Sequence, residues 1–405
     1  MSRGRTLILV ENLSVPFDRR VWQESLSLSR AGFEVVVVCP QGRDRDREPF
    51  EVSEGVTIHR YRLASAVGGP LGYVREYAAA FWHTFRLART LAREQSFDIV
   101  HACNPPDFLL VAALSLKRRG ARFIFDHHDL VPELYLSRFR ARRDPLFRLA
   151  RLLERVTFAL ADVVIATNDS YRAIALTRGR KRPEDVFVVR SAPDLARFRA
   201  GEQDERLKRG KRYLIAYLGV MGPQDGVDHA LRALAALEKQ RNDWHAVFVG
   251  DGDARRGMTR LRDELGLVDE VEFTGRISDE ELLQVLGTAD VCLAPDPKNP
   301  LNDLSTMNKI VEYMAMSRPI VSYDLVEARV SAADAAIYAE PNDEASFAAA
   351  IAELLDDPER RARMGAEGRA RVERDLSWQQ SELALLAAYE RALGRPKDGS
   401  AVSAR

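Results

Sequence analysis

Short apolar segments alternate with amphipathic ones along the chain, and this alternation restricts the fold more than any other feature. Each apolar segment is rich in Val, Ile and Leu, which is typical of a buried strand. The longer segments between them carry apolar residues at helical spacing. Strand, helix and strand in this order predict an α/β fold with a mostly parallel, doubly wound, Rossmann-like sheet.

The alternation occurs twice, which predicts two such domains in 405 residues. We expect an N-terminal domain over 1–194, a linker over the polar stretch 195–211, and a C-terminal domain over 212–374. A helix at 375–393 would pack back on the N-terminal domain, and a tail at 394–405 would be disordered. Ligands bind beside the carboxyl ends of the strands in such sheets, so the two halves would face each other across a cleft. The expected strands are 6–10, 34–39, 57–61, 99–101, 123–126, 163–166 and 186–189, then 213–218, 245–249, 270–273, 291–294, 319–322 and 336–338.

Composition and charge point to a cytoplasmic protein. The 60 basic and 60 acidic residues give a formal net charge of zero, and we expect no nucleic-acid partner. The first residues lack the apolar region of a signal peptide, and no apolar run approaches the roughly 18 residues of a membrane span. The three cysteines have no metal-ligand spacing, which fits a reducing compartment.

The charge is unevenly distributed, however, and this suggests peripheral contact with the inner face of the membrane. Residues 1–190 contain 31 Lys and Arg against 22 Asp and Glu, a net of +9. Two segments, 71–93 and 135–155, combine arginines with aromatic or apolar residues, as basic helices at membrane surfaces do. Packing of sheet-covering helices explains the same pattern.

A polar segment in the second half begins a helix and carries groups suited to a sugar nucleotide. Ser305 or Thr306 is the natural N-cap. Lys309 would lie in the first turn, where a cation and a helix N-terminus together form a phosphate site. Glu312 can accept hydrogen bonds from sugar hydroxyls, and Ser305 and Asn308 add neutral groups. Alternatively, Lys309 pairs with Glu312 on the helix surface.

A second polar loop follows the expected strand 123–126 and contains His127, His128 and Asp129. Residues at this end of a strand are in the position of a binding site. Asp129 would orient a histidine or cap the next helix. Histidines and a carboxylate are also metal ligands, but no third histidine lies at ligand spacing, so we expect no metal.

The first strand-to-helix loop contains Asn12, Asp18, Arg19 and Arg20. It lacks the glycines of a dinucleotide-binding loop. If the sugar nucleotide is the donor in a transfer reaction, we expect Asn12, Asp18, Arg19 and Asp129 to bind the molecule that accepts the sugar. Arg19 and Arg20 would contact a phosphate group of this acceptor or the donor diphosphate. Arginines at a solvated helix start would give the same pattern.

Several short motifs in the second half are specific in their order and spacing. The chain resembles, over nearly its whole length, the two-domain (GT-B) retaining glycosyltransferases of family 4, the glycosyl transferases group 1 of bacterial polysaccharide and glycolipid synthesis. The motifs that carry this resemblance are Leu218-Gly219, Gly226-Val227-Asp228, Phe248-Val249-Gly250-Asp251-Gly252, Val271-Glu272-Phe273-Thr274-Gly275-Arg276, Glu312-Tyr313-Met314-Ala315 and Arg318-Pro319-Ile320-Val321.

The resemblance implies a donor site marked by two glutamates separated by seven residues. The second matches Glu312, which would bind the ribose hydroxyls. The first position is Leu304, and the adjacent Asp303 would take its place.

Two cations that the family usually places at the diphosphate are absent, at Asp225 and near Val220. Lys309, with Arg255 or Arg256, would replace them and stabilise the leaving group.

The resemblance also implies that a histidine after the strand 123–126 lies near the transferred sugar, and either His127 or His128 fits. Tight turns and main-chain groups would hold the nucleobase and phosphates; these are Gly250, Gly252, Gly275 and Arg276.

The expected function is that of a retaining glycosyltransferase. It would move a sugar from a nucleotide-diphosphate donor to a hydroxyl of a glycan or lipid-linked acceptor, without a cofactor or metal ion. The catalytic groups would be His127 or His128, Lys309 and Asp303, and no protein nucleophile is assigned. The alternatives are a nucleotide-sugar epimerase or hydrolase on the same frame, and a catalytically silent glycan-binding protein.

Overall fold

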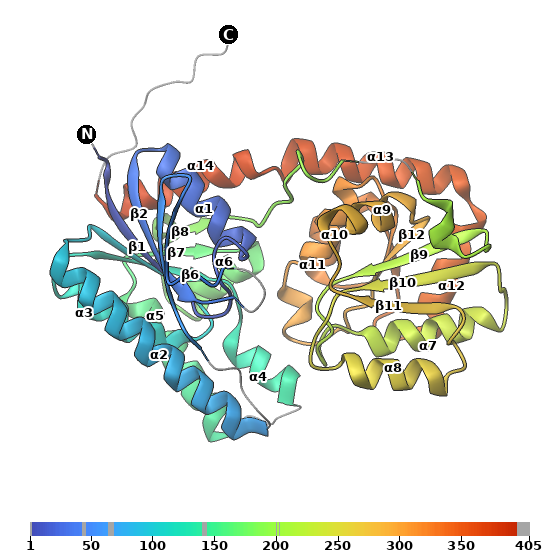
Figure 1. The fold of residues 1–405 in the computed structure, drawn as a ribbon, viewed down its shortest axis with the longest axis horizontal. Coiled ribbons are helices and arrows are strands. Elements are labelled where there is room, and N and C mark those ends of the chain that lie inside the picture. The colour runs from blue at the N-terminus through green and yellow to red at the C-terminus, as the bar shows by residue number, and fades with distance from the viewer. Residues whose placement is uncertain are drawn as a thin grey trace, which may run out of the picture. The chain divides into compact units, whose positions relative to one another are not determined.

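The computed structural model describes residues 2–42, 46–63, 69–139, 144–199, 201 and 203–394. Each half contains an α/β sheet with helices on both faces (Figure 1). Contacts divide the chain into an N-terminal unit and a C-terminal unit. The N-terminal unit takes its described residues from Met1–Leu134, Arg142–Ser191 and Gln379–Arg405, and the C-terminal unit from Tyr135–Ala141 and Ala192–Trp378.

The N-terminal sheet has the strand order β3-β4-β2-β1-β5-β6-β7-β8. All of its neighbouring strands are parallel except β3, which is antiparallel to β4. We did not expect β3 from the sequence, because it is a short edge strand with alternating exposure. The strands are β1 (Gly4–Leu9), β2 (Phe33–Pro40), β3 (Phe50–Ser53), β4 (Val56–Tyr61), β5 (Ile99–Cys103), β6 (Arg122–His127), β7 (Val163–Ala166) and β8 (Val186–Val188).

The central strands of this sheet are mostly apolar because helices cover both faces, and the buried His101 of β5 and Asp126 of β6 are exceptions. Leu7 of β1 lies between Val36 of β2 and Val100 of β5, and all three are buried. The helices are α1 (Arg19–Arg30), α2 (Gly69–Glu94), α3 (Leu110–Lys117), α4 (Val131–Phe139), α5 (Pro145–Leu160) and α6 (Asp169–Thr177).

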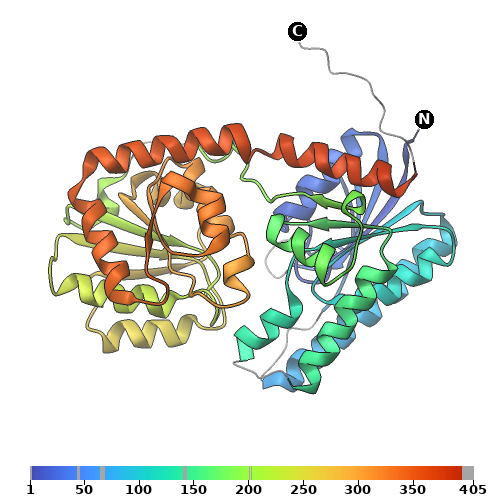
Figure 2. The same ribbon diagram turned by 180° about the vertical axis from the view of Figure 1, so that it is seen from behind.

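The last helix, α14 (Trp378–Ala392), packs against the N-terminal unit (Figure 2). The Tyr389 ring meets Phe33 edge-on, with 5.3 Å between centroids. Glu390 forms an ion pair with Arg3 at the start of the chain. The expected tail from 394 onward lies outside the described residues, apart from Gly394.

The C-terminal sheet has the order β11-β10-β9-β12-β13-β14 and is parallel throughout. Its strands are β9 (Tyr213–Leu218), β10 (Trp244–Val249), β11 (Val271–Gly275), β12 (Val291–Ala294), β13 (Ile320–Tyr323) and β14 (Ala336–Ala339). Its helices are α7 (Val227–Glu238), α8 (Arg255–Glu264), α9 (Asp279–Thr288), α10 (Asn308–Ala315), α11 (Val326–Ala332), α12 (Glu344–Asp356) and α13 (Pro358–Asp375). Two parallel α/β sheets joined in this order form the expected GT-B type of fold.

Within the described part of the chain, no helix combines the length and apolar character that crossing a bilayer requires. All three cysteines are buried and unpaired.

Candidate active site

Glycines after β9 and β10 let two loops of the C-terminal unit approach each other. Gly250 has a φ of +133°, and a Cβ atom placed there would lie 1.9 Å from the carbonyl oxygen of Gly219. At Gly252 it would lie 2.6 Å from the Met221 carbonyl oxygen. Only glycine fits such contacts. These two glycines therefore shape the loops, and their contact with a donor stays a prediction.

Gly275, at the end of β11, has a φ of +71°, and a Cβ there would lie 2.9 Å from Arg255 Nη1. Arg255, one of the two arginines proposed to replace the missing cations, therefore lies beside Gly275, a glycine predicted to line the donor site. The Arg276 side chain is exposed beside it.

The start of α10 differs from the prediction. The N-cap position is Met307, which makes no side-chain cap, and the helix begins at Asn308. The prediction of Ser305 or Thr306 as N-cap is wrong, because their hydroxyls bond elsewhere: Ser305 donates to the Leu301 carbonyl and Thr306 lies 3.4 Å from a Glu327 carboxylate oxygen. The first N–H groups of α10 are therefore left without a side-chain acceptor, and Asn308 is exposed beside them.

Lys309 points into the C-terminal unit, with only 8% of its side chain exposed. Its Nζ atom lies 2.7 Å from Oδ1 of Asp296, which follows β12 and is almost fully buried. The ammonium also lies 5.0 Å from the centre of the Tyr217 ring. The alternative pairing of Lys309 with Glu312 is thus replaced by a buried ion pair with Asp296, and the predicted contact with a phosphate group stays a prediction. Asp296 was missed, although its position directly after a buried strand was a usable signal.

Tyr313 links α10 to the C-terminal sheet through two hydrogen bonds. Its hydroxyl accepts a hydrogen bond from the Leu218 N–H at 2.7 Å and donates to the Leu293 carbonyl at 3.1 Å. Glu312, the predicted ribose ligand, is half-buried on the same helix.

Asp303 has a structural partner that the sequence did not reveal. It lies in the 3₁₀ turn Asn302–Leu304, and its Oδ1 accepts from the Val326 N–H at the start of α11. It also forms an ion pair of 3.4 Å with Lys298. The neighbouring Asn302 is buried and donates to the Gln224 and Pro297 carbonyls. These bonds hold the loop between β12 and α10, and a role of Asp303 in place of the missing glutamate stays a prediction.

In the N-terminal unit, the two adjacent histidines occupy different environments. His127 is fully buried between Phe125, Phe158 and Tyr171, with centroid distances of 5.1 to 5.3 Å. Neither of its ring nitrogens has a hydrogen-bond partner, and burial lowers its pKa to about 3. Because it is neutral and enclosed, His127 belongs to the core.

His128 is the member of the pair that solvent reaches, with 16% of its side chain exposed. Its Nε2 atom lies 2.6 Å from Oδ2 of Asp126 and 2.9 Å from Nε of Arg20. Arg20 also donates to Asp126 Oδ1 at 3.0 Å and to the Val189 carbonyl at 2.7 Å. Burial by itself would raise the pKa of Asp126, but Arg20 and His128 hold that pKa well below its usual range. Asp126 is therefore a buried carboxylate anion that His128 contacts.

Glu24 of α1 completes this buried group of charges. Its Oε1 lies 3.1 Å from Arg20 Nη2, and burial and the nearby Asp126 raise its pKa well above the usual value. One protonated and one ionised carboxyl group thus share Arg20. Arg20 was recognised only as a candidate for phosphate contact, and Asp126 and Glu24 were not recognised at all.

Asn104, after β5, sets the backbone of the histidine loop. Its Oδ1 accepts from the N–H groups of His128 and Asp129, at 2.6 and 3.1 Å. Its Nδ2 donates to the Asp129 carbonyl and to Asp107 Oδ1. The sequence offered only its place after a strand as a signal.

We expect Asn104→Ala to lower kcat about tenfold, because displacement of a catalytic group by a fraction of an ångström is costly. The matched control is Asn168→Ala, which removes another buried asparagine, the N-cap of α6. Steady-state kinetics and thermal melting of both variants separate the effects. An equal loss of kcat in the two variants would mean that general destabilisation, and not the loop, is responsible.

The remaining predicted acceptor residues are Asp129 in this loop, Asn12 and Asp18 between β1 and α1, and Arg19 at the start of α1. Asp18 is the N-cap of α1, and its Oδ1 accepts from the Val21 N–H at 3.1 Å. Asn12 and Arg19 are exposed. The Asp129 carboxyl is half-buried, and removal from water raises its pKa.

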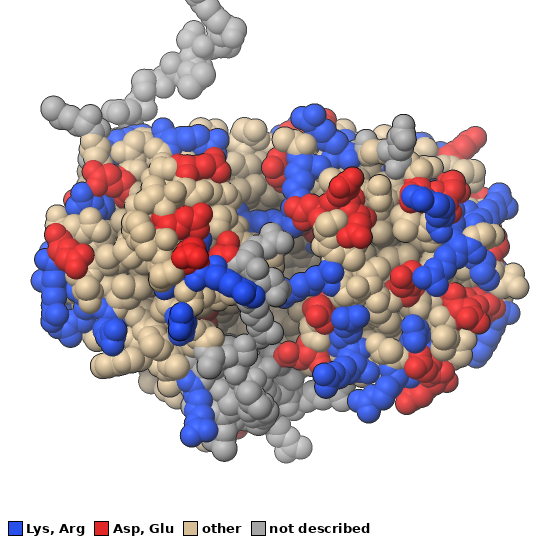
Figure 3. Space-filling view, viewed as in Figure 1, with Lys and Arg blue, Asp and Glu red and all other residues tan. Residues whose placement is uncertain are grey.

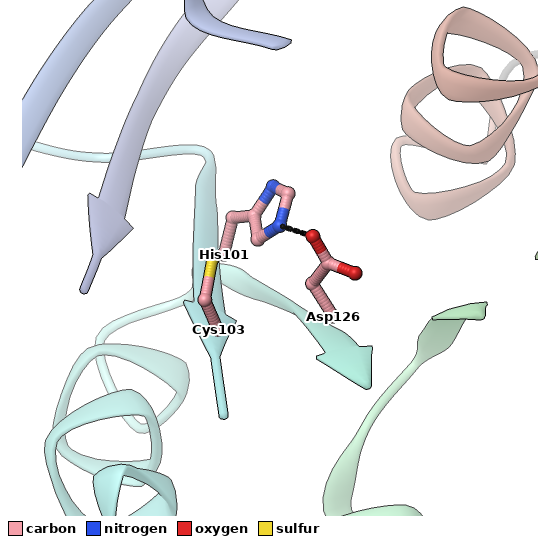
Figure 4. A group of neighbouring side chains, drawn as sticks. All are labelled: His101, Cys103 and Asp126. Carbon is pink, nitrogen blue, oxygen red and sulfur yellow. Dashed lines mark hydrogen bonds and ion pairs between the residues drawn. The ribbon is translucent and has the colours of Figure 1, made fainter. Parts of the chain in front are cut away.

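Among the described residues, two groups of three side chains have potential metal-ligand atoms within 4.8 Å of one another. The first group is His101, Cys103 and Asp126, and the second is Glu24, Asp126 and His128. Figure 4 shows the His101 ring directed at the Asp126 carboxylate from the neighbouring strand. Both groups depend on Asp126, which already bonds Arg20, and burial raises the pKa of Cys103 well above its usual value. The donor set therefore fits a hydrogen-bonded network better than a cation site.

Comparisons with known proteins identify the family of this chain. The model of the family described as Glycosyltransferase Family 4 matches residues 18–197, and that of Glycosyl transferases group 1 matches residues 199–371. The MMP alpha-(1->4)-mannosyltransferase of Mycolicibacterium hassiacum is 29% identical over 323 residues, which cover 77% of this chain and 75% of that protein.

Solved structures share the fold. Sucrose-phosphate synthase from Thermosynechococcus elongatus superposes with a TM-score of 0.80 at 19% identity, covering 97% of this chain and all of that one. HepE of Anabaena in complex with UDP-glucose superposes with a TM-score of 0.70 at 17% identity, covering 96% of this chain and all of that one. Family models thus match both halves of the chain. Members of family 4 of the glycosyltransferases, the glycosyl transferases group 1, are retaining GT-B enzymes that use nucleotide-sugar donors. The chain belongs to this family.

Proposed function

We propose that this enzyme transfers a sugar from a nucleoside diphosphate sugar to a hydroxyl group of a glycan or a lipid-linked glycan. The observation that carries the proposal is the start of α10, which has no side-chain cap and has Lys309 in its first turn. Unsatisfied N–H groups and the positive end of the helix dipole favour a phosphate group. The departing nucleoside diphosphate gains negative charge, so this position stabilises it.

Each unit contributes a different part of the chemistry in this proposal. In the C-terminal unit, Glu312 accepts hydrogen bonds from the ribose hydroxyls and α10 holds the diphosphate. The glycine loops after β9 and β10 allow backbone groups close to the donor. In the N-terminal unit, His128 contacts a hydroxyl of the transferred sugar or of the acceptor. The HepE complex with UDP-glucose makes uridine diphosphate the first donor nucleotide to test.

Titration calorimetry with uridine, guanosine and thymidine diphosphates tests the donor site directly. We expect one of the three to bind, and Glu312→Ala to weaken that binding at least tenfold, the effect of losing a charged hydrogen-bond acceptor. Incubation of the matching sugar nucleotide without acceptor, followed by mass spectrometry, then separates the activities. A transferase leaves most of the donor intact, whereas a hydrolase or epimerase converts it. Absence of binding by all three nucleotides would contradict the proposed function.

We further propose that the acceptor is presented at a membrane and that α5 contacts the lipid. Three leucines on one stripe of this helix, Leu146, Leu149 and Leu152, are 49 to 60% exposed. Arg148 and Arg155 are exposed beside them. On the face drawn in Figure 3, basic and acidic side chains are interspersed on both units, so this proposal depends on α5 and not on overall charge. The arginines at residues 140, 142 and 143 of the predicted membrane segment lie outside the described residues.

We expect the protein to sediment with vesicles that contain anionic lipids and much less with neutral vesicles. Each arginine near an anionic surface is worth about 1 kcal/mol, so Arg148, Arg151 and Arg155 predict a preference of about 100-fold. The triple variant Leu146→Gln/Leu149→Gln/Leu152→Gln should lose most binding, because the leucines would no longer insert. Leu383→Gln, which changes an equally exposed leucine on α14, is the control. Equal sedimentation of the triple variant and the wild type would rule out α5 as the contact.

A further inference from the structure

A chain of buried hydrogen bonds leads from the last helix to His128. The Tyr389 hydroxyl on α14 lies 2.8 Å from Nδ1 of His101 on β5. The other ring nitrogen of His101, Nε2, lies 3.2 Å from Oδ2 of Asp126 on β6. The same carboxylate oxygen lies 2.6 Å from Nε2 of His128. Tyr389, His101 and Asp126 are buried, so water does not compete for these contacts.

The protonation states allow one direction of donation along this chain. Burial lowers the pKa of His101, so the ring is neutral and has a single N–H group. Asp126 is ionised and can only accept, which places the His101 proton on Nε2. Nδ1 then holds a lone pair, and the Tyr389 hydroxyl must donate to it. Burial raises the pKa of Tyr389 well above its usual value, so this hydroxyl keeps its proton.

The same reasoning applies to His128. Its Nε2 atom cannot donate to Asp126 and accept from Arg20 Nε at once, because a ring nitrogen has either a proton or a lone pair. The contact with Asp126 is the shorter of the two, and an anionic acceptor forms the stronger bond. In the neutral form of the His128 ring, the single proton is therefore on Nε2. Its Nδ1 atom is left with a lone pair that can accept a hydrogen bond from a hydroxyl group.

We infer that Tyr389 and His101 are positioning residues for transfer: they orient Asp126, and through it they hold His128 with Nδ1 as an acceptor for a substrate hydroxyl. The role of His128 toward substrate rests on the function proposed above, whereas the proton arrangement does not. Arg20 holds the other oxygen of Asp126, so the carboxylate is fixed from two sides. The last helix of the chain thus supplies a group on which the geometry of the N-terminal site depends.

Nitrogen NMR of the histidine rings tests the proton arrangement without any substrate. The protein has seven histidines, and the variants His101→Gln and His128→Gln assign the two relevant rings by loss of signal. At a pH where both rings are neutral, we expect each to carry its proton on Nε2 in the wild type. A proton on Nδ1 of either ring would overturn the inference, whatever the enzyme is found to transfer.

The variant Tyr389→Phe tests the consequence for turnover. It removes one hydroxyl and keeps the ring against Phe33, so we expect it to fold. With one supporting hydrogen bond lost, kcat should fall about three- to tenfold while the KM for the donor stays within about twofold. Ser381→Ala is the matched control, because it removes a hydroxyl of the same helix that bonds the Arg190 backbone at 2.8 and 3.1 Å, away from this chain.

A double-variant comparison shows whether Tyr389 acts through Asp126. In an Asp126→Asn background, Tyr389→Phe should cause no further loss of kcat, because the two residues belong to one chain of bonds. Independent, multiplicative losses would contradict the inference. So would wild-type kcat in Tyr389→Phe, or an equal loss in Ser381→Ala.

Discussion

Replacing both members of the buried pair, in Lys309→Met/Asp296→Asn, should restore the stability that Lys309→Met loses but not the activity. The single variant leaves the Asp296 carboxylate buried without a counter-charge, and such a change typically costs about 3–5 kcal/mol. The double variant removes both charges from the interior, so we expect its free energy of unfolding to return to within about 1–2 kcal/mol of the wild type.

Activity should respond differently because Lys309 has two roles in our proposal. Lys309 is in the first turn of α10, where the diphosphate is proposed to bind, and its ammonium pairs with Asp296. Loss of one charged group at a leaving phosphate typically lowers kcat by 100-fold or more, so both variants should be equally impaired. Chemical denaturation of the free enzyme and turnover at saturating donor measure the two effects separately.

Asp296→Asn alone completes this comparison. It keeps the lysine charge and removes its partner, so nucleoside diphosphate binding should be retained or strengthened. If the double variant recovered wild-type turnover, Lys309 would serve only the fold, and α10 would have to stabilise the diphosphate through its N–H groups.

His128→Ala should lower kcat about 100-fold, the usual scale for a positioned histidine, whereas His127→Phe should leave kcat within about twofold. The two residues are adjacent, but aromatic rings enclose His127, with Glu154 Oε1 3.8 Å from its Nε2, whereas the surroundings of His128 contain Asp126, Arg20 and solvent. Phenylalanine fits among the rings that surround His127 and removes two nitrogens without hydrogen-bond partners, so the variant should be at least as stable as the wild type. A large loss of kcat in a folded His127→Phe protein would show that the assignment to His128 is wrong.

The free energy of unfolding of His127→Phe should also depend on pH differently from that of the wild type. Burial lowers the pKa of His127 to about 3, so below the ordinary value of 6.5 the unfolded chain takes up a proton that the folded chain does not. The folded state therefore loses stability as the pH falls from about 6.5 toward 3. His127→Phe removes this contribution, and its free energy of unfolding should fall less steeply over that range than that of the wild type.

The strands were predictable because central parallel strands are rich in Val, Ile, Leu and Phe, and all expected strands have a counterpart within a few residues. Edge strand β3 was not, because its alternating polar residues resemble a loop. The start of α10 was misplaced because Ser305 and Thr306 bond to groups distant in sequence, and local propensity does not contain that information.

The sequence contained enough information to distinguish the environments of the two histidines. Side chains alternate along a strand, so Phe125 and His127 share one face of β6 while Asp126 and His128 lie toward the other. The apolar neighbour on the His127 side indicated the core. The network around Asp126 could not be predicted from the sequence. Arg20, His101 and Tyr389 come from three separate elements, and their contacts depend on the complete fold.

Tyr389 is synthesised after the whole C-terminal unit, whereas His101 and Thr6, whose hydroxyl lies 3.4 Å from that of Tyr389, are synthesised before it. Domains usually fold as they emerge, starting from the N-terminus. The sheet of the N-terminal unit can form during translation, but its histidine network stays incomplete until the whole C-terminal unit and α14 have been made. A chain that stops before α14 therefore lacks the Tyr389 hydroxyl that contacts His101 in the complete N-terminal unit.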